Sequence, residues 1–302
     1  MTGDPFASGD HFRSGFVALL GRPNVGKSTL VNRLVDRKVS IVSDKPQTTR
    51  NQIRAVLTTD AAQAVFIDTP GIHRPRTRLG ERLNRQALDT LGEVDAVCFM
   101  IDATAPVGPG DTFIAEHVQE VRTPTVVVVN KVDVASPAQI AAQLEAVQEL
   151  GEFEAFVPLS ARTGDGVGLL VDQLMGHLPE GPRYYPEGVV TDHPEAFVAA
   201  EIVREKLLEV TREELPHSIA VVVDDIEERD NDVLAISAVV LVERSSQKAI
   251  VIGKGGEMIK RVGTKARQEL EVLFGTKVFL ETRVKVERDW QRRDHALDRL
   301  GF

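Results

Sequence analysis

Eight residues near the start of the chain have the types and spacing of a loop that binds phosphate groups. They read Gly-Arg-Pro-Asn-Val-Gly-Lys-Ser over 21–28 and follow an apolar run at 16–20. Glycines let backbone N–H groups converge on phosphate oxygens, and the helix expected next adds partial positive charge at its N-terminus. Lys27 can reach the β- and γ-phosphates of a nucleotide, and the Ser28 hydroxyl can ligate Mg²⁺. The expected phosphate contacts are Gly21, Asn24, Val25, Gly26, Lys27, Ser28 and Thr29.

A second motif, Asp68-Thr-Pro-Gly71, follows the apolar run 65–67, about 40 residues after this loop. An Asp in this position can hold Mg²⁺ through water, and the Gly71 amide can contact a γ-phosphate with no side chain in the way. Alone, the motif is typical of a turn, but downstream of a phosphate loop it predicts a γ-phosphate sensor. The next residue, Ile72, is apolar and cannot orient an attacking water, so intrinsic hydrolysis should be slow.

A third motif predicts which base is bound. Asn130-Lys131-Val-Asp133 follows the apolar run 125–129. The Asp133 carboxylate can accept hydrogen bonds from guanine N1–H and the 2-amino group, a donor pair that adenine lacks. Lys131 can lie along the base plane, and Asn130 can tie this segment to the phosphate loop. Two further residues after the run 155–158 fit a backbone contact to guanine O6, namely Ser160 and Ala161.

Apolar, β-branched runs alternate with helical patterns through the first half of the chain. Strands are expected at 16–20, 53–58, 64–67, 96–101, 125–130 and 155–158, and helices near 27–37, 79–92, 111–121, 137–150 and 166–178. Runs that are apolar on both faces are typical of a parallel sheet covered by helices on each side. The pattern therefore predicts a doubly wound α/β domain, in which ligands bind at the carboxyl ends of the strands. Each motif above falls at such an end.

Composition is that of an ordinary soluble protein of two domains: 302 residues, 42% apolar and 27% charged. No apolar run approaches the roughly 18–20 residues of a membrane span. Residues 1–13 are polar and are expected to form a loose tail, not a signal peptide. The single cysteine, Cys98, lies in the apolar run 96–101 and is expected to be a buried hydrophobe. These features predict a cytoplasmic location.

Charge is distributed unevenly along the chain. The net charge is −9, yet residues 244–302 carry 14 Lys and Arg against 8 Asp and Glu. This asymmetry indicates that the C-terminal part meets an anionic partner. The alternative is a solvated charged face.

A proline-containing stretch at 179–194 is expected to link the first domain to a second one at 195–302. Expected there are a helix at 195–212, strands at 218–226, 233–242, 249–252 and 277–286, and a basic C-terminal helix at 287–300. The segment Gly253-Lys254-Gly255-Gly256 allows a close backbone approach to single-stranded nucleic acid, and the helix after it opens towards phosphate. Gly263 is expected to break that helix. Candidate RNA contacts are Ile252, Gly253, Lys254, Gly255, Gly256, Ile259 and Lys260.

The first half, residues 14–178, resembles the translation-factor-like P-loop GTPases in all five of their signature motifs. The resemblance implies GTP or GDP as ligand and Mg²⁺ held by Ser28, Asp68 and a threonine of the segment 46–50. Thr49 is the expected threonine, with Thr48 as the alternative. Asn24 marks bacterial GTPases thought to use K⁺ in place of an arginine finger; the alternative is that it merely suits a tight turn. The implied catalytic residues are Asn24, Lys27, Thr49 and Gly71.

The second half resembles a KH domain of the type II order, α-β-β-α-α-β, and the alternative is an α+β appendage without an RNA site. A GTPase domain joined to one C-terminal KH domain resembles the Era family of bacterial GTPases over about residues 14–301. That resemblance implies binding near the 3′ end of 16S ribosomal RNA and action in maturing the 30S subunit. Because no segment spans or anchors in a membrane, we expect peripheral contact with its surface at most, and we expect a monomer. One rival is an assembly factor with a structural nucleotide. Another is an RNA-dependent ATPase or small-molecule kinase, which Asp133 disfavours.

Overall fold

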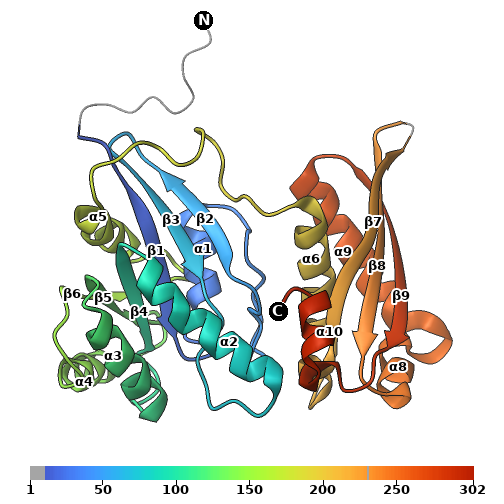
Figure 1. Cartoon of the computed structure of the whole chain (residues 1–302), viewed down its shortest axis with the longest axis horizontal. Helices are drawn as coiled ribbons and strands as arrows, with labels where there is room; N and C mark the ends of the chain where they lie inside the picture. Colours follow the sequence, from blue (N-terminus) through green and yellow to red (C-terminus); the bar gives the residue numbers. More distant parts are fainter. Residues whose placement is uncertain (1–10, 230) are drawn as a thin grey trace, which may run out of the picture. The chain divides into compact units, whose positions relative to one another are not determined.

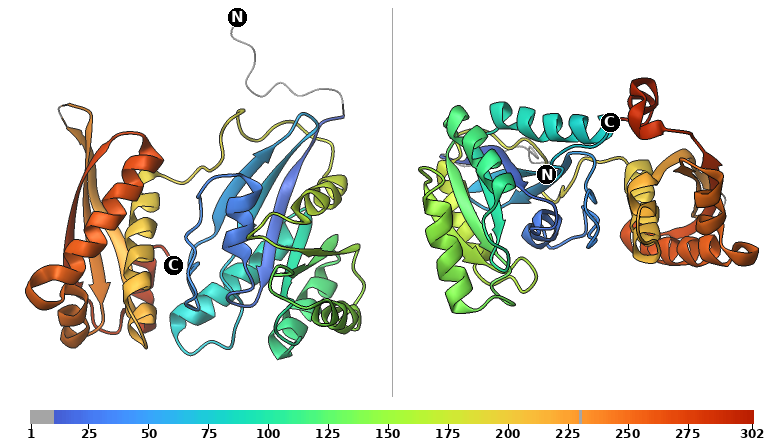
Figure 2. Two further views of the ribbon diagram at one scale, coloured as in Figure 1. Left: turned by 180° about the vertical axis from the view of Figure 1, so that it is seen from behind. Right: turned by 90° about the horizontal axis from the view of Figure 1, so that it is seen from below.

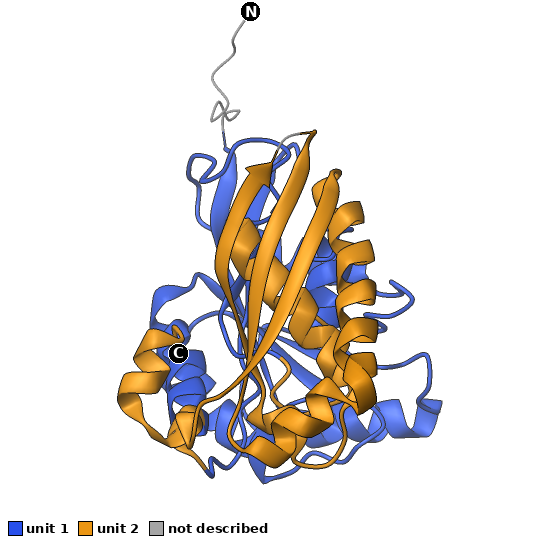
Figure 3. Ribbon diagram, turned by 90° about the vertical axis from the view of Figure 1, so that its right-hand side faces the viewer, with its two compact units in different colours: residues 1–40, 49–76, 80–192 blue, residues 41–48, 77–79, 193–302 orange. Residues whose placement is uncertain are grey.

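The computed structural model describes residues 11–229 and 231–302, which divide into two compact units (Figures 1 and 3). The first unit holds residues 11–40, 49–76 and 80–192. The second holds residues 193–302 together with two short segments from earlier in the chain, 41–48 and 77–79. Residues 1–10 of the expected tail, which was placed at 1–13, lie outside the described residues. Within them, Phe12 is already buried and Arg13 begins the first strand.

The first unit is built on a six-stranded sheet in the order β2-β3-β1-β4-β5-β6. Neighbouring strands are parallel except β2, which is antiparallel to β3 at one edge. Their bounds are β1 Arg13–Gly21, β2 Ile53–Thr58, β3 Ala62–Asp68, β4 Ala96–Asp102, β5 Thr125–Asn130 and β6 Ala155–Leu159.

Helices cover both faces of this sheet, as the end-on view shows (Figure 2). On one face, α1 (Lys27–Leu34) and α5 (Val167–His177) pack with alternate residues of the strands, such as Val126 and Val128. On the other face, α2 (Arg78–Asp89), α3 (Pro109–Val121) and α4 (Pro137–Gln148) pack with Val127 and Val129. Burial on both faces explains the continuous valine run of β5. The predicted doubly wound α/β fold is confirmed.

The second unit follows the order α6 (Glu195–Val210), α7 (Leu215–Ser218), β7 (Ala220–Arg229), β8 (Val233–Val242), α8 (Ser245–Ile252), α9 (Glu257–Phe274) and β9 (Lys277–Val286). Its sheet has the order β7-β8-β9, with β7 antiparallel and β9 parallel to β8. Helices α6, α8 and α9 supply buried residues to the core, including Val203, Val251 and Val262. Apart from the short α7, this is the α-β-β-α-α-β order expected of a type II KH domain, so this prediction is confirmed too.

Three local predictions in the second unit are wrong. Residues 249–252 belong to helix α8, because Gln247 Oε1 accepts the backbone N–H groups of Glu243 and Arg244 and so caps the helix start. A four-residue apolar run does not by itself distinguish a strand from a helix. Gly263 does not break α9, which is continuous over Glu257–Phe274. A glycine inside a helix costs only about 1 kcal/mol, and Val262 and Ala266 on either side of it are buried in the core.

The expected long basic helix at 287–300 is instead a 3₁₀ turn, η3 (Trp290–Arg292), followed by the short helix α10 (Asp294–Arg299). Asp289 has φ of +52°, which interrupts a helix at this point. Trp290 is fully buried, and its indole N–H donates to the Ser218 carbonyl at 3.0 Å. Anchoring of this indole folds the segment back on the unit, which a straight helix would not allow.

The segment Ile41–Thr48 packs within the second unit, although it is far from that unit in sequence. Ile41 joins the core formed around α6. The Val42 N–H donates to Glu205 Oε1 at 3.0 Å, and the Arg204 guanidinium donates to the Thr48 carbonyl. The charged residues Arg204, Glu205 and Lys206 are all buried. The sequence did not predict this packing.

Candidate functional site

Four loops carry the predicted nucleotide contacts, and all follow strands of the first unit. They come after β1, β3, β5 and β6, which run parallel, so their carboxyl ends lie at the same edge of the sheet. Asn130 joins three of these loops: its side-chain amide donates to the Val25 carbonyl at 2.7 Å, and its Oδ1 accepts the Ala161 N–H at 2.9 Å. The fold therefore brings the predicted phosphate and base contacts together.

The phosphate loop ends where α1 begins, at Lys27. Gly26 has φ of +107°, and a Cβ atom there would collide with the side-chain amide of Asn130, so only glycine fits. Asn24 also lies in the left-handed region, with φ of +64°, which asparagine tolerates better than most residues. The loop is thus shaped by the residues of its motif.

Lys27 is buried and folds back on the loop, where its ammonium donates to the carbonyls of Gly21 at 3.0 Å and Arg22 at 3.1 Å. Burial lowers the pKa of Lys27 to about 8, and the nearby charge of Asp68 opposes this shift only in part. A triphosphate beside the ammonium would restore the charged form and raise this pKa again.

We therefore expect nucleotide binding to take up a proton at this lysine. At pH 8 about half of the free protein carries a neutral Lys27, so binding should absorb roughly half a proton, rising towards one at higher pH. Nucleotide affinity should fall as pH rises above 8, because the free form binds the proton less tightly than the complex. Calorimetry in two buffers of different ionisation enthalpy measures the uptake. Lys27→Arg, whose guanidinium stays charged, is the control, and buffer-independent heats for the wild type would contradict the expectation.

Asp68 is the meeting point of three hydroxyl groups. Its Oδ2 accepts from Ser28 at 2.7 Å, from Ser40 at 2.8 Å and from Thr49 at 3.3 Å, and the Ser28 and Thr49 hydroxyls are 2.9 Å apart. Thr48, the alternative switch residue, bonds the Lys45 carbonyl instead. Burial raises the pKa of Asp68, while Lys27 and the hydroxyl bonds oppose the shift. The structure thus groups Ser28 and Thr49 with Asp68 and leaves Thr48 out of the group.

These residues fit a Mg²⁺ ion. Asp68 Oδ1 is buried and has no hydrogen-bond partner among the described residues, so it has capacity to accept from a metal-bound water. Two hydroxyls and a carboxylate are oxygen donors of the kind that Mg²⁺ prefers, with nucleotide phosphates completing the set.

The backbone after Asp68 runs against the phosphate loop. A Cβ atom at Gly71 would lie 2.7 Å from the backbone of Pro23, so a side chain is excluded here. Ile72 is only 2% exposed and packs in the core with Leu20 and Phe99. Its side chain therefore has neither the chemistry nor the position to orient a water.

The base-binding loops hold Asp133 by both of its oxygens. Ser160 donates to Oδ1 at 2.7 Å, and the Arg162 guanidinium pairs with Oδ2. The Ser160 bond first, and the charge of Arg162 after it, outweigh desolvation and lower the pKa of Asp133. Lys131, at φ of +72°, pairs with Asp102 Oδ2 at 2.5 Å. The carboxylate is thus ionised, and both of its oxygens are paired with donors of the protein itself.

Four residues of this site were missed by sequence reasoning. Ser40 bonds Asp68, Asp102 orients Lys131, Arg33 donates to the carbonyls of the loop after β6, and Arg162 pairs with Asp133. For Asp102 there was a signal, because it is a polar residue at the carboxyl end of a buried strand. The other three carry none, since their partners are set by tertiary structure.

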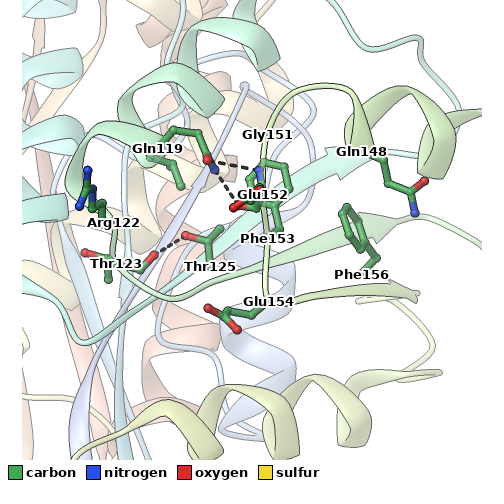
Figure 4. Close-up of a pocket in the computed structure, with 11 residues that line it drawn as sticks. Gln119, Arg122, Thr123, Thr125, Gln148, Gly151, Glu152, Phe153, Glu154 and Phe156 are labelled. Carbon is green, nitrogen blue, oxygen red and sulfur yellow. Dashed lines mark hydrogen bonds between the residues drawn. The ribbon is translucent and has the colours of Figure 1, made fainter.

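A hollow of about 880 Å³ lies elsewhere on the first unit and is not the nucleotide site (Figure 4). It is lined at the start of β5 and before β6, the edge of the sheet opposite to the motif loops. Two of its polar side chains bond backbone carbonyls of the lining: Gln119 donates to the Glu152 carbonyl at 2.8 Å, and Thr125 donates to the Thr123 carbonyl at 2.8 Å.

In the second unit, the candidate RNA loop joins α8 to α9. Gly253, Gly255 and Gly256 all have positive φ, and α9 begins at the residue after them. Lys254 and Lys260 are exposed, whereas Ile252 and Ile259 are partly buried against the core. The loop therefore offers open backbone and charge beside an apolar edge, the combination that suits single-stranded RNA.

Fold and sites together define a P-loop GTPase joined to a KH domain. Two family models match accordingly: that described as 50S ribosome-binding GTPase over residues 16–131, and the KH domain over residues 214–291. A variant of Aquifex aeolicus Era bound to GDP·AlF₄⁻ is 40% identical, with a TM-score of 0.92, over 96% of this chain and 99% of that one. Era in complex with MgGDPNP and nucleotides 1506–1542 of 16S ribosomal RNA is 41% identical, with a TM-score of 0.93 and the same coverage. The chain belongs to the Era family of GTPases.

Proposed function

We propose that this chain is a GTP-hydrolysing switch that binds 16S ribosomal RNA near its 3′ end and acts in assembly of the 30S subunit. The observation that carries this proposal is the likeness, over 96% of the chain, to an Era structure that holds both MgGDPNP and 16S RNA. The family model that matches the GTPase domain is described as a 50S ribosome-binding GTPase, but it covers only residues 16–131. The likeness to the Era structure extends over 96% of the chain and includes the RNA-binding unit.

In this proposal Mg²⁺ is held by Ser28 and Thr49, with Asp68 acting through water. Bound there, the ion neutralises charge on the β- and γ-phosphates. Lys27 adds charge next to the same phosphates, and the Gly71 N–H donates to the γ-phosphate. Asp133 reads guanine while Asn130 keeps the base and phosphate loops in register.

The proposal includes K⁺ as a second cation, placed by Asn24 against the β- and γ-phosphates to supply the charge of an absent arginine finger. The left-handed conformation of Asn24 is compatible with this role, but it also suits the tight-turn alternative. Equal turnover in KCl and NaCl would remove K⁺ from the mechanism.

RNA binding is assigned to the loop Gly253–Gly256 and to Lys254, Ile259 and Lys260 around it. Replacing Lys254 by Gln should weaken RNA binding and lower the slope of log K against log salt concentration by about one phosphate contact. Lys277→Gln, another exposed lysine of the same unit, is the matched control. An unchanged slope in the Lys254 variant would remove this residue from the site.

The switch requires that the bound nucleotide, GTP or GDP, affects the RNA-binding unit. The segment Ile41–Thr48 can transmit this effect, because it belongs to that unit and is joined directly to Ser40 and Thr49 of the GTPase unit. Ser40 and Thr49, which flank the segment, both bond Asp68 Oδ2. The segment itself packs within the RNA-binding unit through Arg204 and Glu205. Ordering of Thr49 by Mg·GTP would thus constrain a segment that is structurally part of the other unit.

RNA affinity is therefore expected to be higher with a nonhydrolysable GTP analogue than with GDP, and RNA should raise affinity for the analogue by the same factor. Arg204→Gln, which removes the charge that holds the Thr48 carbonyl, should move this ratio towards one. Filter binding of a 3′-terminal 16S fragment measures both ratios. Identical wild-type affinities in the two nucleotide states would sink the switching scheme.

Lys27→Ala distinguishes the switch from an assembly factor whose nucleotide is only structural. An assembly defect with normal folding and RNA affinity supports the switch, whereas normal assembly supports the rival. The ATPase or kinase alternative requires ATP to bind as tightly as GTP.

Because its proposed RNA partner matures where ribosomes are assembled, we propose a cytoplasmic location. No helix of the described chain has both the length and the apolar character to cross a bilayer. Peripheral membrane contact and a monomeric state remain predictions. Vesicle co-sedimentation and sedimentation velocity, respectively, would test them.

A further inference from the structure

One side chain in the base-binding loops has a position that the guanine motif does not explain. The Arg162 guanidinium pairs with Asp133 Oδ2, on the carboxylate assigned to guanine. The Ser160 hydroxyl donates to Oδ1 of the same carboxylate at 2.7 Å. Both oxygens of the guanine-reading residue are therefore engaged by donors of the protein itself.

The backbone around Arg162 is held by hydrogen bonds, whereas its side chain lies largely in solvent. Arg33 donates to the Arg162 carbonyl at 2.5 Å, and the preceding N–H, that of Ala161, donates to Asn130 at 2.9 Å. The Arg162 side chain is 70% exposed, against 13% for Asp133. Because the guanidinium lies largely in solvent, water and salt screen this pair, and the guanidinium can leave the carboxylate without disturbing the loop.

The guanidinium of Arg162 and the edge of guanine that would replace it on Asp133 have similar hydrogen-bond donors. The N1–H and 2-amino group of guanine flank one carbon and present two coplanar N–H donors, as an arginine guanidinium does. Ser160 belongs to the loop expected to serve guanine O6, and its hydroxyl donates to Oδ1 at 2.7 Å, so Oδ1 is the oxygen on the N1–H side of the base. Oδ2, the oxygen paired with Arg162, is then the acceptor that remains for the 2-amino group.

We propose that Arg162 is a specificity-determining residue, which competes with the 2-amino group of guanine for Asp133 Oδ2. It keeps the carboxylate paired while the site lacks a base, and it must be displaced each time a guanine nucleotide binds. It therefore lowers affinity for guanine nucleotides. The inference rests on guanine as the base read by Asp133.

The test uses the full-length, nucleotide-depleted protein with GDP, IDP and ADP. Arg162→Gln, a neutral side chain of similar reach, should tighten GDP binding roughly two- to fivefold, because the carboxylate of the free protein is then open to the base. IDP lacks the 2-amino group, so its affinity should change less. Arg85→Gln, at an exposed arginine of α2 in the same unit, is the matched control and should change neither. The difference in GDP affinity between the wild type and Arg162→Gln should become smaller as the KCl concentration rises, because salt screens the charge of the exposed guanidinium.

Unchanged or weaker GDP binding in Arg162→Gln would overturn the proposal, since the arginine would then be idle or would support the bound base. An equal gain for GDP and IDP would overturn the assignment to the 2-amino group, and so would a gap that salt leaves unchanged. A wild type that binds ADP as tightly as GDP would instead overturn the reading of guanine by Asp133. That result is separate from the behaviour of Arg162.

Discussion

Thr49→Ala is expected to lower the rate of GTP hydrolysis by about a hundredfold, the usual scale for loss of one group that stabilises developing charge. The Thr49 hydroxyl lies 2.9 Å from Ser28 and 3.3 Å from Asp68, within the group that fits Mg²⁺. Alanine removes a ligand that acts when the γ-phosphate is present. GDP affinity should therefore change little, because GDP has no γ-phosphate for the switch segment to sense.

The neighbouring threonine supplies a matched control for this expectation. Thr48 is similarly buried, but its hydroxyl donates to the Lys45 carbonyl at 2.6 Å and not to Asp68. Thr48→Ala should leave hydrolysis within a few-fold of the wild type. Single-turnover hydrolysis, with GDP affinity and the unfolding transition recorded for both variants, makes the comparison. If Thr48→Ala were the impaired variant, the assignment of Thr49 as switch residue would be wrong.

Much of the fold followed from the sequence because its signals are local. The valines of 126–129 are apolar on both faces, and a strand of that kind requires a helix layer on each side. The nucleotide motifs are likewise short and positioned by the strands before them. Residues 249–252 are helical and not a strand, because a brief apolar run fits either conformation; the Gln247 side chain caps the helix that contains them.

The remaining features depend on contacts between residues far apart in the chain. Residues 41–48 form a polar loop without periodicity, and their partner Glu205 lies 163 residues from Val42. Ser40 and Arg162 gain their meaning only when the fold brings them to Asp68 and Asp133. Such partners leave no spacing in a single sequence. Ser40, Arg162 and the segment 41–48 were therefore harder to predict from the sequence than the residues that bind phosphate.

Asp133→Asn is expected to exchange the base that the protein prefers. The amide oxygen can still accept guanine N1–H, but the amide nitrogen then faces the 2-amino group donor to donor. Affinity for GTP should fall by on the order of a thousandfold, because buried polar groups are left unpaired. Xanthine carries a carbonyl at this position and accepts from the amide, so XTP should bind where GTP no longer does.

Competition of GDP and XDP for the same site measures this exchange. Asp165→Asn, an exposed aspartate of the loop that carries Ser160, is the control and should keep the wild-type preference. Asp133→Asn retains an Oδ1 atom that accepts from the Ser160 hydroxyl, so the loop should keep its shape. Unchanged preference for GDP over XDP in Asp133→Asn would show that the base is read elsewhere. Loss of both nucleotides with an intact unfolding transition would assign Asp133 to loop structure, not to recognition.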